Sequence, residues 1–260
     1  MQPVALITGA SAGIGAELAR VFAQHGHAVV LTARRQAQLQ KLADDIAATG
    51  AKQPHVVATD LETVGGTERL ARALAERGLE PAIVVNNAGF GLSGNAADLD
   101  IGAQLRMIDL NVRALTDLSL RFIDSMARHR GGILNVASIA GFVPGPGMAV
   151  YHACKAYVIS LTEALHQELK PRGVRVSVLC PGPVPTQFLA RAGRSIGQYP
   201  RYMVRSAGHV AREGYEGFMR GDRVIVPGLH NKAMVKLSRF LPFRLFFGIA
   251  ELASRSRRSI

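Results

Sequence analysis

Cysteine, tryptophan and long apolar runs are scarce in, or missing from, this 260-residue chain. It has no tryptophan, and its two cysteines, Cys154 and Cys180, form no C-x-x-C pair. That pattern argues against a disulfide framework and against a zinc site. The apolar run that follows Met1 is too short for a signal peptide, and no apolar run reaches the roughly 18 residues of a membrane-spanning helix. We therefore expect a cytoplasmic protein that holds no metal ion.

Acidic residues are also in short supply. The chain carries 19 of them against 31 lysines and arginines, a formal net charge of +12. Such an excess raises nucleic acids and anionic membranes as partners. The sequence has no aromatic-rich stretch and no helix-turn-helix pattern, so we expect no nucleic-acid partner. Half of the excess charge falls between residues 232 and 258, which makes the tail a separate feature.

Short apolar segments alternate with helical patterns along most of the chain. The apolar runs predict buried strands at residues 4–7, 28–33, 55–58, 83–85, 133–137, 174–179 and 224–226. Helical patterns lie between them, including 36–48, 207–219 and one long helix over 103–128 with Asn111 in its middle. This alternation indicates an α/β fold, a single doubly wound, Rossmann-like parallel sheet flanked by helices on both faces. The predicted domain spans residues 1–230, and a basic amphipathic helical extension follows at 231–260.

A glycine-rich loop follows the first predicted strand. Residues 8–15 read TGASAGIG, a G-x-x-x-G-x-G spacing, and a helical pattern begins at their end. A strand, a glycine loop and a helix start in this order cradle a phosphate, because glycines let backbone N–H groups approach it and the helix N-terminus adds positive potential. The same loop also serves as a tight turn between a strand and a helix, so alone it indicates a dinucleotide only weakly.

The second predicted strand ends without an acidic residue. Chains that bind NAD place an aspartate or glutamate about 20 residues past the glycines, where it bonds the ribose 2′-hydroxyl. Arg34 and Arg35 stand at this point instead, and guanidinium groups suit the 2′-phosphate of NADPH. The alternative is an exposed arginine pair that merely opens the next helix. Which arginine would hold the phosphate stays open.

Ser138, Tyr151 and Lys155 are candidates for proton-transfer chemistry. Tyr151 and Lys155 are four residues apart, so on a helix their side chains share a face. Ser138 follows the strand predicted at 133–137. A tyrosine hydroxyl has a pKa of about 10 and is a poor acid–base catalyst at neutral pH, so we expect the nearby cation to lower this pKa. Taken alone, a Tyr-x-x-x-Lys pair is more often solvated on a helix surface.

These features, with NNAG at 86–89 and PGPVPT at 181–186, resemble the short-chain dehydrogenase/reductase family. The resemblance runs in order from residue 4 to about residue 186 and implies a dinucleotide-binding and catalytic domain that holds NADPH or NADP⁺. The cofactor contacts that it implies, with the arginines above, are Gly9, Ser11, Gly13, Ile14, Gly15, Arg34, Arg35, Asp60, Leu61, Asn87, Ala88, Gly89, Tyr151, Lys155, Pro181, Gly182, Val184 and Thr186. The catalytic group that it implies is Ser138, Tyr151, Lys155 and Asn111.

The resemblance further implies an oxidoreductase that moves a hydride between NADP(H) and a carbonyl or secondary alcohol, in other words a carbonyl reductase. Tyr151 would be the acid or base, Ser138 would hold the substrate oxygen, and Asn111 would hold a water for proton relay. A homo-oligomer, either a dimer or a tetramer, is expected with it. A non-catalytic NADP(H)-binding redox sensor on the same fold is the alternative, although such a sensor would not need all three reactive residues together.

Substrate choice is expected to reside in residues 183–206. This segment mixes apolar and basic side chains: Phe188, Leu189, Tyr199, Tyr202, Met203, Arg191, Arg194, Arg201 and Arg205. The mixture suits an apolar or acyl-type substrate, as in lipid metabolism, and it equally suits an ordinary mobile lid.

The tail repeats apolar residues every three or four positions, an amphipathic helical pattern. The residues concerned are Met234, Leu237, Leu241, Leu245, Ile249 and Leu252, with Pro242 dividing the pattern into two helices. The apolar stripe either packs on protein, meaning the domain or a second subunit, or makes a peripheral membrane contact. In the second case Phe240, Phe243, Phe246 and Phe247, flanked by basic residues, would lie on an anionic lipid surface.

Overall fold

A computed structural model of the protein describes residues 1–238. The described part of the chain builds one sheet with the strand order β3-β2-β1-β4-β5-β6-β7, and every strand pair is parallel. The strands are β1 (Gln2–Thr8), β2 (Val29–Ala33), β3 (His55–Ala58), β4 (Leu79–Asn86), β5 (Gly132–Val136), β6 (Arg175–Leu179) and β7 (Val224–Ile225). The predicted doubly wound parallel sheet is confirmed.

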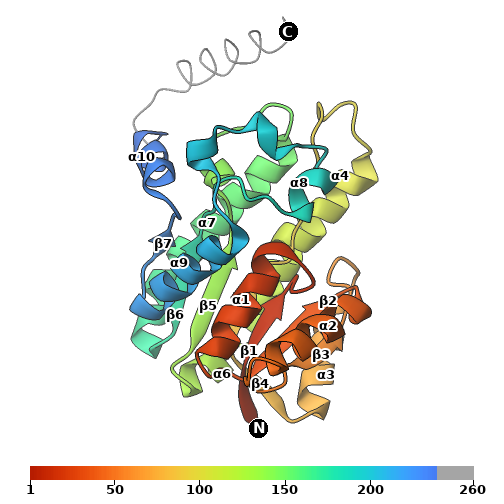
Figure 1. Cartoon of the computed structure of the whole chain (residues 1–260), viewed down its shortest axis with the longest axis vertical. Helices are drawn as coiled ribbons and strands as arrows, with labels where there is room; N and C mark the ends of the chain where they lie inside the picture. The colour runs from red at the N-terminus through yellow and green to blue at the C-terminus, as the bar shows by residue number, and fades with distance from the viewer. Residues whose placement is uncertain (239–260) are drawn as a thin grey trace, which may run out of the picture.

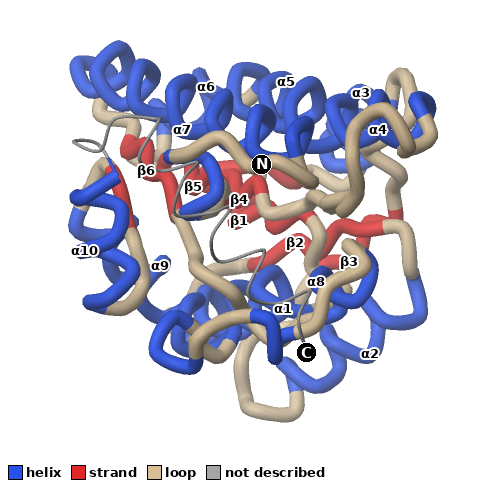
Figure 2. Tube along the Cα trace, turned by 90° about the horizontal axis from the view of Figure 1, so that it is seen from above, coloured by secondary structure: helices blue, strands red, loops and turns tan. Residues whose placement is uncertain are grey.

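Helices cover both faces of this sheet (Figure 2). One face carries α1 (Gly13–Gln24), α2 (Gln36–Ala47) and α9 (Ala207–Arg220). The other carries α3 (Gly66–Glu76), α4 (Ile101–Ile108), α5 (Leu115–Arg121), α6 (Ile123–Arg128) and α7 (Ala149–Leu169). Two short helices, α8 (Gln187–Arg191) and α10 (Leu229–Ser238), lie beyond the sheet at the end opposite the N-terminus (Figure 1). Among the described helices, none combines the length and the apolar character needed to cross a bilayer.

Strand β1 shows why the sheet is buried on both sides. Successive side chains of a strand point to opposite faces, and here Ala5 and Ile7 join the core under α1 and α9, whereas Val4 and Leu6 join the core under α3 and α7. All four are at most 2% exposed. Because a fully buried aliphatic side chain contributes about 1.5–3 kcal/mol, an unbroken apolar run is what a central parallel strand requires.

The chain reverses its direction of winding at β1, and this reversal places the site. From β1 it proceeds to β2 and β3 on one side, then returns so that β4 pairs with the opposite edge of β1. The loops after β1 and β4 therefore diverge to opposite faces and leave a crevice at the carboxyl ends of these strands, where ligands of open α/β sheets bind.

The helical pattern predicted over 103–128 is confirmed, but it is not one regular helix. The segment consists of α4, a π-helical stretch at Asp109–Ala114, α5 and α6, with a break at Phe122, whose φ and ψ are −108° and 16°. Apolar periodicity continued through both irregularities, so the sequence pattern did not reveal them. The π-helical stretch contains Asn111, and tertiary contacts described below account for its position.

Helix α10 is docked on the domain. Asn231 is buried and donates hydrogen bonds to the carbonyl oxygens of Met203, at 3.1 Å, and Pro227, at 2.9 Å. Val235 packs into the core cluster around β6 and α7. Helix α10 therefore contacts the domain through Asn231 and Val235, whereas Met234 and Leu237, the members of the predicted apolar stripe in this helix, are 40% and 60% exposed. The rest of that prediction, including Pro242 and the four phenylalanines, lies outside the described residues and stays a prediction.

Candidate active site

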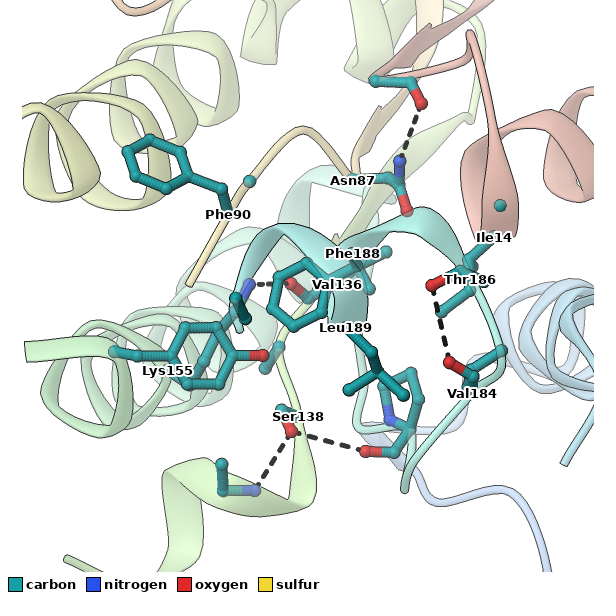
Figure 3. Close-up of a pocket in the computed structure, with 18 of the residues that line it drawn as sticks. Ile14, Asn87, Phe90, Val136, Ser138, Lys155, Val184, Thr186, Phe188 and Leu189 are labelled. Atoms are coloured by element: carbon teal, nitrogen blue, oxygen red, sulfur yellow. Dashed lines mark hydrogen bonds between the residues drawn. The ribbon is translucent and has the colours of Figure 1, made fainter. Parts of the chain in front are cut away.

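The ends of β1 and β4 are locked together by one threonine and one asparagine. Thr8 Oγ1 accepts hydrogen bonds from the backbone N–H groups of Asn87, at 2.9 Å, and Ala88, at 3.0 Å, and donates to the carbonyl of Val85 at 3.2 Å. Asn87 Nδ2 donates to the carbonyl of Thr8 at 2.9 Å and to that of Gly9 at 3.3 Å, the second of which is drawn in Figure 3. These bonds fix the loops after β1 and β4 relative to each other on the two sides of the crevice. We call this rigid arrangement the cradle.

Glycine is required at two positions of this cradle. Gly9 has φ +66°, and a Cβ there would lie 2.8 Å from the Cα of Ala88. Gly15 lies behind the loop, where a Cβ would come within 2.5 Å of the Gly9 carbonyl oxygen. The loop can therefore pack this closely against β4 and α1 only because Gly9 and Gly15 have no side chain. Of the cofactor contacts implied by the resemblance, Gly15 is the one that does not line the cavity described below, and its role is close packing.

The two arginines after β2 point to different partners. Arg34 pairs with Glu62 at 3.3 Å, and its side chain is 57% exposed. Arg35 reaches back to the glycine loop, where its Nη2 donates to Ser11 Oγ at 2.9 Å. Both line the cavity, but Arg34 has a carboxylate partner, Glu62, which it shares with Arg106 at 3.2 Å, whereas Arg35 contacts neutral oxygens.

Ser138, Tyr151 and Lys155 meet at the carboxyl end of β5. Lys155 Nζ donates to the carbonyl of Val136 at 2.9 Å and lies 5.7 Å from the centre of the Tyr151 ring. The 3₁₀ turn at Ile139–Phe142 packs against α7 at Gly141, where a Cβ would be 2.7 Å from the Lys155 carbonyl oxygen. That close approach brings Ser138, which precedes the turn, to the phenol of Tyr151.

The expected pKa of Tyr151 is corrected by its surroundings. Burial raises the pKa of the phenol above 10, and the hydrogen bond with Ser138 opposes this only in part. Lys155 is itself buried, and burial lowers the pKa of its ammonium to about 8. Both side chains are under 10% exposed, so desolvation outweighs the attraction that the sequence spacing suggested. The protein by itself keeps Tyr151 protonated at neutral pH, which is the state of a proton donor.

Asn111 is buried behind the cradle and does not line the cavity. Its Nδ2 donates to the carbonyl of Phe90 at 2.8 Å, and its Oδ1 accepts from the backbone N–H of Phe90 at 3.1 Å. These two hydrogen bonds attach the π-helical stretch to the β4–α4 loop. Short π-helical stretches of this kind are frequent at functional sites. A Cβ at Gly89 would lie 2.7 Å from Asn111 Oδ1 and 3.7 Å from Lys155 Nζ, so the amide approaches the buried lysine.

One cavity of about 490 Å³ runs from the glycine loop to α10. The predicted residues that line its nucleotide end and its centre are Gly9, Ser11, Gly13, Ile14, Arg34, Arg35, Asp60, Leu61, Asn87, Ala88, Gly89, Ser138, Tyr151, Lys155, Pro181, Gly182, Val184 and Thr186. From the segment expected to choose the substrate, Phe188, Leu189, Tyr199 and Met203 line it, whereas Tyr202 is exposed. Figure 3 shows Phe188 and Leu189 on the ribbon that crosses the cavity.

Several apolar side chains at the far end of the cavity were not predicted to line it: Phe90, Val143, Met148, Met234 and Val235. They come from the β4–α4 loop, the loop before α7 and α10. Apart from Met234, which belongs to the predicted stripe of the tail, no local pattern marks them, because each is one apolar residue among many. Only the fold brings them to Tyr151.

The protein is similar over most of its length to known oxidoreductases. The family model described as short chain dehydrogenase matches residues 3–196. Sulfoacetaldehyde reductase 2 of Chromohalobacter salexigens is 34% identical over 197 residues, which is 74% of this chain and 77% of that protein. This chain belongs to the short-chain dehydrogenase family.

Solved structures of family members share the fold almost end to end. A short-chain dehydrogenase from Sphingobium yanoikuyae in complex with NADPH is 32% identical, with a TM-score of 0.82 over 97% of this chain and 95% of that one. The bulky-bulky ketone specific alcohol dehydrogenase from Comamonas testosteroni is 29% identical, with a TM-score of 0.76 over 100% of this chain and 94% of that one. The protein is thus a short-chain dehydrogenase, an oxidoreductase that uses a nicotinamide cofactor.

Proposed function

We propose that this short-chain dehydrogenase transfers hydride between NADP(H) and the carbonyl or secondary alcohol of an apolar substrate. The observation that carries the proposal is the position of Ser138, Tyr151 and Lys155. They lie between the glycine cradle and the apolar end of a single cavity, so a nucleotide in the cradle and a substrate beside Phe90 and Met148 would meet at the phenol.

Each residue has a role in this scheme that follows from its contacts. The bound cofactor supplies or accepts the hydride. Tyr151, which is protonated at neutral pH, donates its proton to the substrate oxygen as negative charge develops there. Ser138, whose hydroxyl donates to the carbonyl of Pro181 at 3.4 Å and accepts from the N–H of Ala140 at 3.1 Å, would turn to hold the same substrate oxygen. Lys155, fixed by Val136, places a cation beside the ring and stabilises the phenolate that remains after proton transfer.

Further residues would hold the cofactor and the proton path in place. The cradle around Gly9 is too close to β4 to admit side chains, and this suits the pyrophosphate of a dinucleotide. Asp60 and Leu61 would flank the adenine end. Asn111, wedged between Phe90 and the approach to Lys155, would position a water that returns a proton to the site.

The nucleotide preference can be tested with the two arginines. Arg35→Ala is expected to weaken NADPH binding roughly tenfold to a hundredfold, because a hydrogen bond to a charged group contributes about 1.5–3 kcal/mol. Arg34→Ala should have the smaller effect, since Glu62 already pairs with this side chain. NADH affinity should change less than about twofold in both variants. Fluorescence titration of both nucleotides measures this, and equal or tighter NADH binding by the unaltered protein would refute the NADP(H) assignment.

The substrate class is tested by turnover. The far end of the cavity is lined mainly by aromatic, methionine and aliphatic side chains, with His152 and Arg194 beside them, and this mainly apolar lining supports a bulky apolar carbonyl compound. A panel of aromatic ketones, steroids, acyl thioesters, sugars and small anionic aldehydes, each with NADPH, separates the classes. We expect the highest kcat/KM for a bulky apolar member. Turnover confined to sugars or small anions would contradict the apolar assignment.

Self-association and membrane contact are further proposals. Leu120 and Tyr157 are 47% and 40% exposed and line a shallow hollow on the outer face of α5 and α7, which supports a dimer or tetramer. The membrane proposal rests on the basic and apolar residues of the tail after Ser238. Flotation with anionic liposomes, comparing the full chain with one ending at Ser238, which keeps the docked helix α10, tests it.

A further inference from the structure

Helix α8 forms a lid over the cavity and reaches both of its ends. It follows Thr186 after β6, and its ribbon crosses the cavity in Figure 3. Phe188 and Leu189 line the cavity on the underside of this lid. Gln187 and Arg191 also line it, but their polar ends lie at the nucleotide end, beside Arg35.

Two arginines converge on one amide oxygen at this end. Gln187 Oε1 accepts hydrogen bonds from Arg35 Nη1, at 3.2 Å, and from Arg191 Nη2, at 3.3 Å. Arg35 is also bonded to Ser11 of the glycine loop at 2.9 Å. Three segments that are far apart in the sequence therefore meet here: the glycine loop, the end of β2 and the lid. The neutral oxygens of Ser11 and Gln187 join them to the guanidinium groups of Arg35 and Arg191.

The charge at this point is uncompensated within the described residues. Arg34 pairs with Glu62, but no ion pair with a carboxylate is found for Arg35 or Arg191 in the part of the chain that the structure describes. Burial, then the positive charges of Arg191 and Arg34, lower the pKa of Arg35. The two guanidinium groups thus repel each other in the protein alone, and an anion between them would remove the repulsion.

We infer that Arg191, carried by the lid, binds the 2′-phosphate of NADPH together with Arg35. The inference rests on the proposed use of NADP(H). The phosphate takes up the hydrogen bonds that Gln187 Oε1 now accepts, and it pulls α8 onto the nucleotide. NADH offers no anion at this point, so with NADH the lid is held less firmly. Cofactor recognition and closure over the substrate are then one event.

The other end of the lid has a separate attachment that does not depend on the nucleotide. Arg194 Nε donates to Ser93 Oγ in the β4–α4 loop at 3.1 Å. The lid therefore spans the cavity between a contact near the 2′-phosphate and a contact near the substrate. Only the first contact places like charges together, so only the first should respond to the phosphate.

Binding measurements separate a specific contact from a general effect of charge. Arg191→Gln removes one positive charge from the lid, and Arg201→Gln removes one from the exposed turn that follows it, outside the cavity lining. We expect Arg191→Gln to weaken NADPH binding about tenfold and to leave NADH binding within about twofold. Arg201→Gln should change neither. Equal loss of NADPH affinity in both variants, or none in Arg191→Gln, would overturn the inference.

Gln187→Glu tests the position without removing either arginine. Its carboxylate would occupy the place of the phosphate and pair with both guanidinium groups, so NADPH binding should weaken by more than about tenfold while NADH binding is retained. A Gln187→Glu variant that keeps the full preference for NADPH would contradict the proposed phosphate position.

Hydrogen exchange of the lid provides a readout that does not depend on turnover. In the unaltered protein, NADPH should slow amide exchange in residues 187–194 more than saturating NADH does, and Arg191→Gln should abolish this difference. Equal protection by both nucleotides in the unaltered protein would refute the coupling. If the unaltered protein shows no preference for NADPH, both the proposed cofactor and this inference fail. If the unaltered protein prefers NADPH and Arg191→Gln prefers it by the same factor, the proposed cofactor stands and only the inference about Arg191 fails.

Discussion

Tyr151→Phe is expected to lower kcat by about 10²- to 10⁴-fold, the usual contribution of a positioned general acid. The phenol is 8% exposed and packs against Phe188 at 5.5 Å between ring centres. Phenylalanine fills the same space, so the loss is confined to the proton. NADPH affinity should stay within about twofold, because the cradle around Gly9 is untouched. Steady-state kinetics on the best substrate of the panel and a nucleotide titration measure the two effects.

Tyr157→Phe is the matched control. It lies on the same helix, its side chain is exposed, and its hydroxyl contacts Thr116 at 3.0 Å rather than the cavity. The control should keep kcat and KM within about twofold. Near-normal turnover by Tyr151→Phe would exclude the proposed proton donor, and a parallel loss in Tyr157→Phe would point to damage to α7 instead.

Lys155→Met is expected to raise stability while abolishing activity. Burial lowers the lysine pKa from 10.5 to about 8, which corresponds to about 3 kcal/mol of unfavourable desolvation at neutral pH. Methionine fills similar space without charge and loses one hydrogen bond to Val136, a cost of about 1 kcal/mol. The net gain is about 1–2 kcal/mol, and kcat should fall by about 10²-fold or more because the phenolate loses its neighbouring cation.

The pH dependence of unfolding identifies the cause. Between pH 8 and 10.5 the folded protein binds fewer protons at Lys155 than the unfolded chain does, so this group makes stability rise with pH over that window. The rise should be absent from Lys155→Met. Lys41→Met on the exposed side of α2 is the control and should shift stability by less than about 0.5 kcal/mol. A less stable Lys155→Met protein, or an unchanged pH profile, would show that burial of Lys155 does not lower the free energy of unfolding.

Local sequence was sufficient for the fold and for the order of the motifs. Strand β1 is an apolar run that ends in a glycine loop, and such a run is stable only when both of its faces are covered. The four-residue spacing of Tyr151 and Lys155 placed them on one helical face, and α7 confirms this. These predictions held because strand and helix periodicity, glycine geometry and helix spacing act over a few residues.

Features that depend on contacts across the chain could not be predicted in this way. The π-helical stretch contains Asn111, whose amide bonds to Phe90, 21 residues earlier, and such a contact leaves no local pattern. The sequence spacing predicted a lowered pKa for Tyr151, but burial raises it, and burial is known only once α7, the Ile139–Phe142 turn and the lid are packed together. The apolar end of the cavity likewise draws on separate loops and α10.

The contact between Arg35 and Gln187 is the clearest case, since 152 residues separate them in the chain. The sequence alone determined that arginines follow β2 and that a segment of mixed apolar and basic residues follows β6. Tertiary structure decided that Arg34 pairs with Glu62 and that Arg35 shares the side-chain oxygen of Gln187 with Arg191. Charge–charge energies depend on distance and on desolvation, and neither quantity is contained in the order of the residues.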